Sequence, residues 1–188
     1  MERTIIKAIK NDVSIFAMHT NLDNIKQGVN QKLGALLNLQ QPEILSPKPG
    51  KLMKLVTFVP QEYTYRVLDA LHKAGAGVIG EYDHCSFRVQ GTGRFKPSEK
   101  ATPHTGKKNT LEEVKEDRLE VIFPVSKKDS VIKALSKSHP YEEVAYYLHD
   151  LANLYQESGS GMIGNLTNKL KPEEFLEFLK KSLRLNFL

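Results

Sequence analysis

The residues best suited to chemistry stand in a few short groups along the chain. His139 is followed, after Pro140 and Tyr141, by the two acids Glu142 and Glu143, so an imidazole and two carboxylates could exchange a proton there. The same five residues also fit a turn that leads into a strand, with Pro140 shaping the entry and Tyr141 packing. We adopt the turn as the interpretation, since nothing else in the pattern identifies a catalytic group.

Three further groups are explained by structure as well as by chemistry. His84 and Cys85 are neighbours, but adjacent residues of a strand face opposite sides, so we expect no Cys-His nucleophile and predict that Cys85 is a small buried hydrophobe. His104 lies in a basic loop and is predicted to be solvated. Asp23, four residues after His19, has the position of an acid in the first turn of a helix, where the helix dipole favours it.

Two glycine groups suggest phosphate-binding loops. Neither has the strand, turn and long helix with a downstream acid that a dinucleotide site requires. Tight turns and close packing of the backbone explain them better. The glycines are Gly75, Gly77, Gly80, Gly159, Gly161 and Gly164.

Length and composition describe an ordinary globular protein. The chain has 188 residues, of which 40% are hydrophobic and 26% charged. It contains no apolar run of the roughly 20 residues that cross a bilayer, and its N-terminus does not resemble a signal peptide. The single cysteine, Cys85, cannot form an internal disulfide. We therefore expect a cytoplasmic protein with no membrane partner.

The net charge of +5 is concentrated in one loop. Residues 94–108 contain five Lys or Arg and one Glu, a local excess of +4. Such a loop can bind phosphates. Because no recognition motif or pattern of stacking aromatic residues accompanies the charge, we do not expect a nucleic-acid partner.

The hydrophobic pattern places these groups on an α/β framework. Residues 13–18 form a compact apolar run that predicts a buried strand. Apolar residues from Leu22 to Leu37 recur every three or four positions, which predicts a helix with Asn21 as its N-cap. Residues 40–50 contain three prolines and a glycine and are predicted to be a linker or domain boundary.

The middle of the chain predicts strands and helices in the order β-α-β-β-α-β. This is the ferredoxin-like arrangement, with an extra hairpin near Asp83. Two stretches repeat a strand, a proline-containing turn and a helix, which indicates a pseudo-symmetric α+β sandwich. The predicted strands are residues 52–60, 75–82, 85–91, 118–125 and 142–151, and the predicted helices are residues 63–74 and 127–138.

Six strings, in this order and spacing, resemble the Nif-three-like family, also named GTP cyclohydrolase I type 2 homologs. Each string alone is a weak signal, but together they cover nearly the whole chain. They are HTNLD (residues 19–23), GAGVIGEYDHCSF (75–87), GTGRFKP (91–97), EEVKEDRLE (112–120), HPYEEVAYYL (139–148) and SGSGMIGNL (158–166).

The resemblance implies an α/β core domain with an inserted ferredoxin-like domain of the PII/CutA-like type. On this basis we expect a partial core domain at residues 1–49, the insert at 50–152, and a return segment of the core at 153–188. SGSGMIGNL is expected to be a glycine-rich turn at the start of that return. The family assembles as a toroidal hexamer, so we expect homo-oligomers, and we expect exposed apolar surface and self-association in the flanking segments.

The resemblance also implies two divalent metal ions per subunit, zinc, iron or another metal, with Asp23 as one ligand. The family's other ligands come from a paired-histidine motif upstream and a His and Glu near the C-terminus, and this sequence matches neither. We therefore expect a truncated chain with an incomplete metal site. Its function is either that of a metal-dependent hydrolase with unknown catalytic residues or that of a regulatory binding module based on the insert. The small-molecule substrate is not identified by the sequence.

Overall fold

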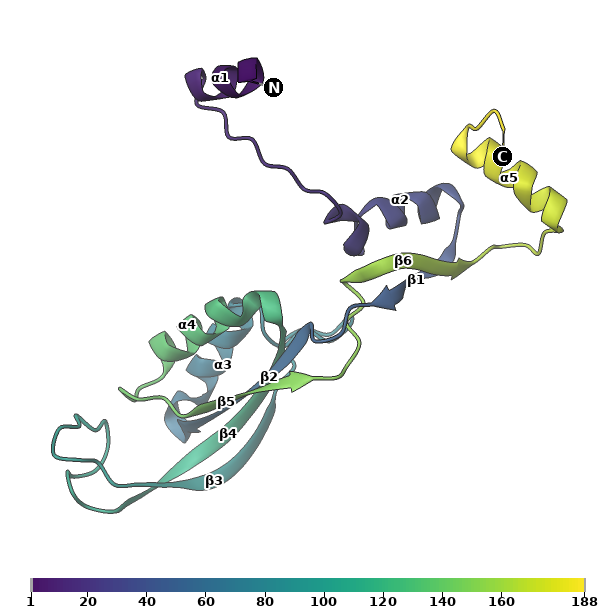
Figure 1. Cartoon of the computed structure of the whole chain (residues 1–188). Helices are drawn as coiled ribbons and strands as arrows, with labels where there is room; N and C mark the ends of the chain where they lie inside the picture. The colour runs from purple at the N-terminus through teal and green to yellow at the C-terminus, as the bar shows by residue number, and fades with distance from the viewer. Residues whose placement is uncertain (1, 188) are drawn as a thin grey trace. The chain divides into compact units, whose positions relative to one another are not determined.

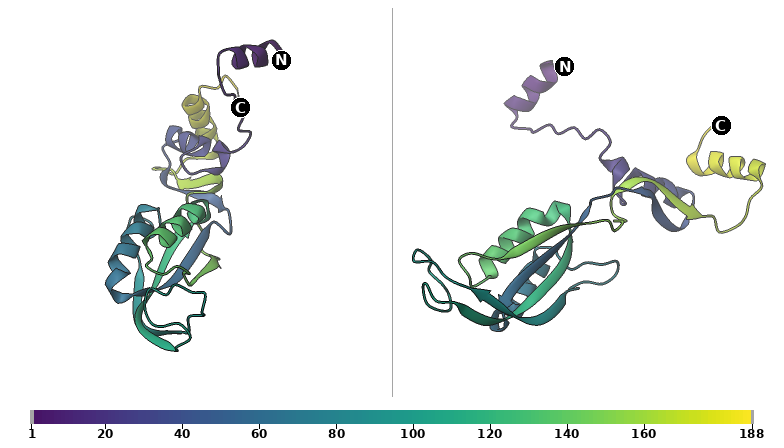
Figure 2. Two further views of the ribbon diagram at one scale, coloured as in Figure 1. Left: turned by 90° about the vertical axis from the view of Figure 1, so that its left-hand side faces the viewer. Right: turned by 60° about the horizontal axis from the view of Figure 1, so that its bottom comes forward.

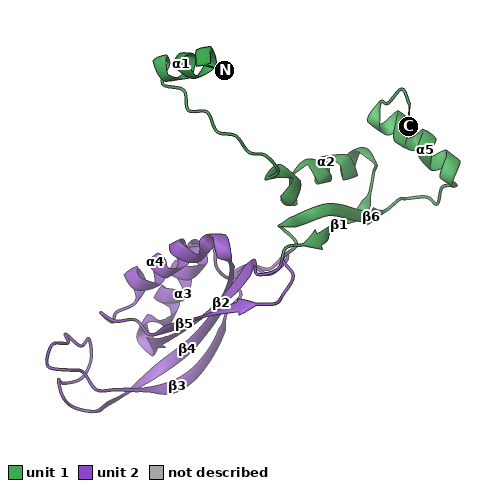
Figure 3. Ribbon diagram, in the orientation of Figure 1, with its two compact units in different colours: residues 1–48, 156–188 green, residues 49–155 purple. Residues whose placement is uncertain are grey.

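The protein is a mixed α/β chain, and its computed structural model describes residues 2–187. The chain divides into two compact units (Figure 3). Unit 2 is one continuous segment, residues 49–155, whereas unit 1 joins residues 1–48 with residues 156–188. None of the helices in the described residues is long and apolar enough to cross a membrane.

Unit 2 is a four-stranded antiparallel sheet with two helices on one face (Figure 1). Its elements follow the predicted order β-α-β-β-α-β, and its strands lie in the order β3-β4-β2-β5 across the sheet. This is the ferredoxin-like order of elements. The elements are β2 (Leu52–Pro60), α3 (Thr64–Lys73), β3 (Phe87–Phe95), β4 (Glu112–Pro124), α4 (Lys128–Ser138) and β5 (Tyr146–Leu151), with short 3-10 turns η2 (Gln61–Tyr63) and η3 (Val125–Lys127).

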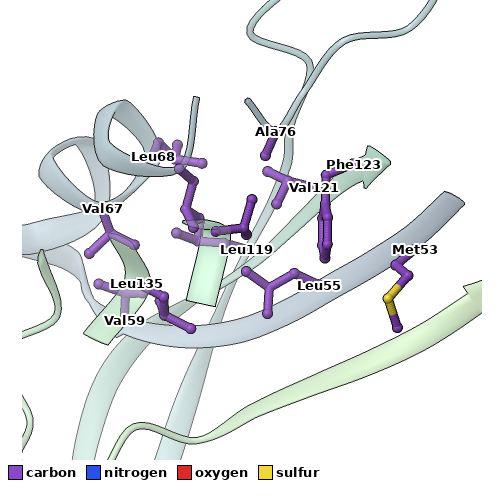
Figure 4. Packing of buried hydrophobic residues seen from close by; sticks show 12 residues of the cluster. Met53, Leu55, Val59, Val67, Leu68, Ala76, Leu119, Val121, Phe123 and Leu135 are labelled. Carbon is purple, nitrogen blue, oxygen red and sulfur yellow. The ribbon is translucent and has the colours of Figure 1, made fainter. Parts of the chain in front are cut away.

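The hydrophobic core of unit 2 lies between the sheet and these helices (Figure 4). Its members recur at every second position in the strands and at spacings of three and four in the helices, which are the periods of the two structures. Complete burial of one such side chain stabilises the fold by about 1.5–3 kcal/mol. The buried cluster consists of Met53, Leu55, Val59, Val67, Leu68, Leu71, Ala76, Leu119, Val121, Phe123, Val131 and Leu135.

The other face of the sheet is not covered by a helix of unit 2 in the described residues. Pairing across β3, β4 and β2 places Val89, Arg118 and Phe58 in one row on this face. Tyr147 of β5 belongs to the same face, because the next residue, Leu148, packs against the core. Residues 96–111 form a long loop between β3 and β4 (Figure 2). This loop and the uncovered face together enclose a pocket.

Unit 1 is built around a two-stranded antiparallel ribbon. β1 (Gln40–Pro47) pairs with β6 (Gly159–Asn165), and α2 (Val29–Leu36) contacts β6. The other elements are α1 (Glu2–Lys10), the 3-10 turn η1 (Leu22–Asn24) and α5 (Pro172–Leu183). Ile44 is the one large apolar side chain that is buried among the described residues of unit 1. The predicted exposure of apolar surface in the flanking segments is therefore confirmed.

Two predictions for the N-terminal segment are wrong. Residues 13–18 are exposed and have no regular secondary structure, because no strand in the described part of the chain pairs with them. The helix predicted from Leu22 to Leu37 is divided into η1 and α2. The division lies at Gly28, which has an extended backbone conformation at the N-cap of α2. A side chain at position 28 would overlap the carbonyl oxygen of Leu22. Asn21 precedes η1 and makes no capping hydrogen bond through its side chain.

Three further segments differ from the sequence prediction. Most of the predicted linker at residues 40–50 is strand β1, and most of the predicted turn at 158–166 is strand β6. Each of these strands exists because the other pairs with it, and composition alone does not reveal such a distant partner. Residues 75–82 are not a strand but a turn region, with positive φ angles of 100° at Gly75, 80° at Gly77 and 57° at Gly80.

Candidate ligand pocket

The pocket of unit 2 has a volume of about 840 Å³, which suits a small organic molecule. Its floor is the uncovered face of the sheet, and its walls are the loop at residues 96–105 and the segment that precedes β5. Aromatic rings and charged groups of both signs line it. These residues are Phe58, Phe95, His104, Tyr141 and Tyr147, with Arg94, Lys96, Arg118, Glu116, Glu142 and Glu143.

Glu116 is the carboxylate at the floor of the pocket. It lies in β4 opposite Gly91 of β3, and only 7% of its surface is exposed. Its Oε1 accepts a hydrogen bond of 2.9 Å from the hydroxyl of Tyr141. Its Oε2 accepts no hydrogen bond from a described residue, and Glu116 is one of the residues that line the pocket. An acceptor in a largely buried position is therefore open to a donor that enters the pocket.

Gly93 makes room for this carboxylate. A Cβ atom at position 93 would overlap Glu116 Oε2 and lie 2.6 Å from its Cδ. Gly91, two residues away in the same strand, has no atom within 4 Å of the place where its Cβ would be. The Glu116 carboxylate therefore requires a glycine at position 93 but not at position 91.

Tyr141 binds Glu116 directly, and His139 supports the backbone of Tyr141. Burial raises the pKa of Tyr141, and its hydrogen bond to Glu116 raises it further. The phenol therefore keeps its proton and donates a hydrogen bond to the carboxylate. The Nδ1 atom of His139 accepts the backbone N–H of Tyr141 at 3.1 Å, so the proton of the neutral ring is on Nε2, which donates to the carbonyl of Phe58 at 2.9 Å. Burial lowers the pKa of His139 and favours this neutral form.

The segment from His139 to Glu143 is thus a turn before β5, as predicted. Both ring nitrogens of His139 are used in hydrogen bonds with the backbone, so this imidazole has no free nitrogen with which to move a proton. The role of Tyr141 is larger than the packing that the sequence suggested, because its hydroxyl fixes the carboxylate of Glu116. Glu142 accepts the backbone N–H of Thr102 at 2.7 Å and ties the basic loop to this turn.

The basic loop is ordered by contacts rather than simply solvated. The ring of His104 lies 5.4 Å from that of Tyr63 and 6.0 Å from that of Tyr141. His104 is exposed, as predicted, but it also lines the pocket. Arg94 lies 3.7 Å from Glu113, while Lys96 forms no ion pair with a described residue and is free to meet an anion.

His84 and Cys85 lie in the turn region before β3, not in a strand as predicted. His84 has a φ of 54°. Cys85 is partly exposed, so the prediction of a buried residue is wrong, and its thiol contacts the carbonyl of Asp83 at 3.7 Å. The ring of His84 packs against that of His72 at 4.7 Å. These residues do not line the pocket of unit 2.

Asp23, the metal ligand implied by the family resemblance, is exposed in η1 and is its first-turn acid. Its backbone carbonyl accepts the side-chain amide of Asn30 at 2.8 Å. Nowhere among residues 2–187 do three or more His, Cys, Asp or Glu side chains gather closely enough to hold a metal ion. Since a centre of two divalent ions needs several such ligands, the residues present do not fit it.

Comparison with known proteins places the whole chain in one group. The family model described as Duf34/NIF3 (NGG1p interacting factor 3) matches residues 1–188. The chain is 45% identical over 185 residues to the GTP cyclohydrolase 1 type 2 homolog of Bacillus subtilis, and it covers 50% of that protein. It is 47% identical over 181 residues to the homolog of Halalkalibacterium halodurans, of which it covers 49%. The chain thus spans about half the length of the curated relatives it matches.

The fold is similar to that of a solved relative. The Bacillus cereus protein related to NIF3 matches 97% of this chain at 44% identity with a TM-score of 0.80, and 48% of that protein is covered. Staphylococcus aureus protein SA1388 matches 96% of this chain at 23% identity with a TM-score of 0.55, and 45% of that chain is covered. The second likeness concerns the fold alone.

Proposed function

The chain belongs to the DUF34/NIF3 family, and aromatic and charged side chains line the pocket of unit 2. We propose that this pocket binds a small molecule composed of a flat ring and an anionic group. Aromatic side chains stack on flat rings, and Arg and Lys bind anions. Both kinds of side chain line the pocket. The relatives' name refers to GTP, a molecule that has both features.

One observation carries this proposal. The Glu116 carboxylate is fixed by Tyr141 at the floor of a cavity of about 840 Å³, with its second oxygen unpartnered among the described residues. A buried carboxylate is stable only when hydrogen-bond donors satisfy it. Tyr141 satisfies Oε1, so a donor for Oε2 must come from a molecule in the pocket. The binding module is thus favoured by contacts that are present, whereas the hydrolase needs a centre that the described residues do not assemble.

The metal-dependent hydrolase stays a prediction for this chain, as do the two divalent ions, the role of Asp23 and the hexamer. The assignment of unit 2 as a PII/CutA-like insert in a NIF3 core domain also stays a prediction. Its support is the family membership together with the β-α-β-β-α-β order. Elemental analysis of the chain purified without a metal-binding tag tests the metal: about two ions per chain support the hydrolase, and essentially none contradicts it.

The binding proposal is tested by NMR titration of the ¹⁵N-labelled full chain with GMP, AMP, CMP and UMP, and with inorganic phosphate as control. We expect at least one nucleotide to shift the amide signals of Gly91, Gly93 and Tyr147 more than phosphate does. A Gly91→Leu variant, whose side chain would extend into open space in the pocket, should lose the shifts of Gly93 and Tyr147. If no nucleotide shifts the pocket signals, the proposal is wrong.

A further inference from the structure

We propose that Glu116 determines specificity in this pocket and that it recognises the N–H donors on the edge of a guanine-type base. This inference rests on the proposed function, since it assigns the ring that the pocket accepts. It concerns a site in unit 2, whereas Asp23, the one ligand position implied by the family, lies in unit 1.

The charge around Glu116 requires a donor rather than an acceptor. An ionised carboxylate only accepts hydrogen bonds. Glu116 forms no ion pair with a described Lys or Arg, although Arg118 is two residues away and pairs instead with Glu120 at 2.8 Å. The hydroxyl of Tyr141 satisfies one oxygen. The ligand must therefore supply at least one N–H or O–H group to the other oxygen.

Guanine fits this requirement better than adenine or cytosine does. Its N1–H and its 2-amino group stand side by side and point in the same direction, so they match Oε2 and the lone pair of Oε1 that the Tyr141 hydroxyl does not use. Adenine and cytosine offer one amino group beside a ring nitrogen that carries a lone pair, and that lone pair would face a carboxylate oxygen. A site that is built to receive hydrogen bonds discriminates strongly against a molecule that leaves its buried groups unpaired.

The surroundings keep this acceptor in one position. Tyr141 holds Oε1, and His139 holds the backbone of Tyr141. Gly93 leaves the space that Oε2 occupies. The ring of Phe95 at the end of β3 and the ring of Tyr141 both line the pocket, with centroids 6.1 Å apart, and they give the base a surface to pack on. His139, Tyr141 and Gly93 are thus positioning residues for Glu116.

The test compares the affinities of GMP, IMP, 1-methyl-GMP and AMP for the full chain by isothermal titration calorimetry, with NMR to locate the site. IMP lacks the 2-amino group and 1-methyl-GMP lacks the N1–H. We expect GMP to bind most tightly, IMP less tightly, and both 1-methyl-GMP and AMP at least about tenfold more weakly than GMP. These comparisons use the unaltered chain, so they do not depend on whether a variant folds.

A Glu116→Gln variant supplies the second arm. Its amide offers one donor and one acceptor, so the preference for GMP over AMP should fall by about tenfold or more. Glu81→Gln is the matched control, because it makes the same change of charge at an exposed residue of unit 2 that does not line the pocket and forms no ion pair with a described residue. It should leave the preference unchanged.

The outcomes separate this inference from the proposed function. Equal binding of GMP and AMP in the pocket, or a preference that survives Glu116→Gln, overturns the role of Glu116 and leaves the binding module standing. Absence of any nucleotide from the pocket overturns the binding module itself.

Discussion

Replacement of Gly93 by alanine is expected to dislodge the Glu116 carboxylate and to destabilise unit 2. A Cβ atom at this position would overlap Oε2 and lie 2.6 Å from Cδ, so the carboxylate must move. Its movement breaks the 2.9 Å hydrogen bond from Tyr141, and a hydrogen bond to a charged group contributes about 1.5–3 kcal/mol. Alanine is better than glycine in a strand by roughly 0.5–1 kcal/mol. The net loss is therefore about 1–2 kcal/mol.

Gly91→Ala provides the matched control. Gly91 is in the same strand and on the same face, and the site of its Cβ is open. Its replacement should leave the free energy of unfolding unchanged or raise it by roughly 0.5–1 kcal/mol. The chain contains no tryptophan, so far-ultraviolet circular dichroism during heating is a suitable assay. We expect Gly93→Ala to lower the Tm by roughly 2–8 °C relative to the wild type. Equal Tm values for the two variants would refute the close packing of Glu116 under Gly93.

Three further predictions concern the core of unit 2. Thr64→Val removes the 2.6 Å hydrogen bond to the buried Asp117 carboxylate and should lower the free energy of unfolding in urea by about 1.5–3 kcal/mol. Thr64→Ser keeps the hydroxyl and should lower it less. Equal losses of stability in the two variants would contradict this. Leu135→Ala, at a fully buried position, should lower the free energy of unfolding by about 2–5 kcal/mol. Leu154→Ala, at a position that is 66% exposed, should change it by less than about 0.5 kcal/mol. Similar losses in the two variants would contradict the placement of Leu135 in the core. Burial lowers the pKa of His139 in the folded protein below its unfolded-state pKa of 6.5. The stability that the neutral ring contributes is therefore complete above pH 6.5 and is lost as the pH falls through the pKa of the folded protein. An NMR titration midpoint for His139 above 6.5 would contradict this.

Unit 2 was predictable from the sequence because its periodicities are local. Val67 and Leu71 recur at helical spacing, and Leu119, Val121 and Phe123 alternate as a strand with one buried face requires. The ribbon of unit 1 was not predictable in the same way. The segment 40–47 contains prolines, and its partner in β6 lies more than a hundred residues away in the sequence. A strand that depends on a distant partner has little signal in its own residues.

The pocket was only partly predictable. The sequence drew attention to the turn from His139 to Glu143 and to the basic loop, and both line it. Glu116 was not predicted, because the strand predicted from the sequence begins at Arg118, whereas β4 begins at Glu112. Residues 115–118 are four consecutive charged residues, so no apolar alternation extends the predicted strand back from Leu119 to Glu116, and the sequence contains no signal for an acid at the floor of a pocket.

The central claim is that this chain binds its ligand through unit 2 without a metal centre. The most direct measurement is NMR titration of GMP into the full chain after treatment with a chelator. We expect the amide signals of Gly91 and Gly93 to shift as they do before the treatment. Shifts that need an added divalent metal, or that occur around Asp23 instead of the pocket, would contradict the claim.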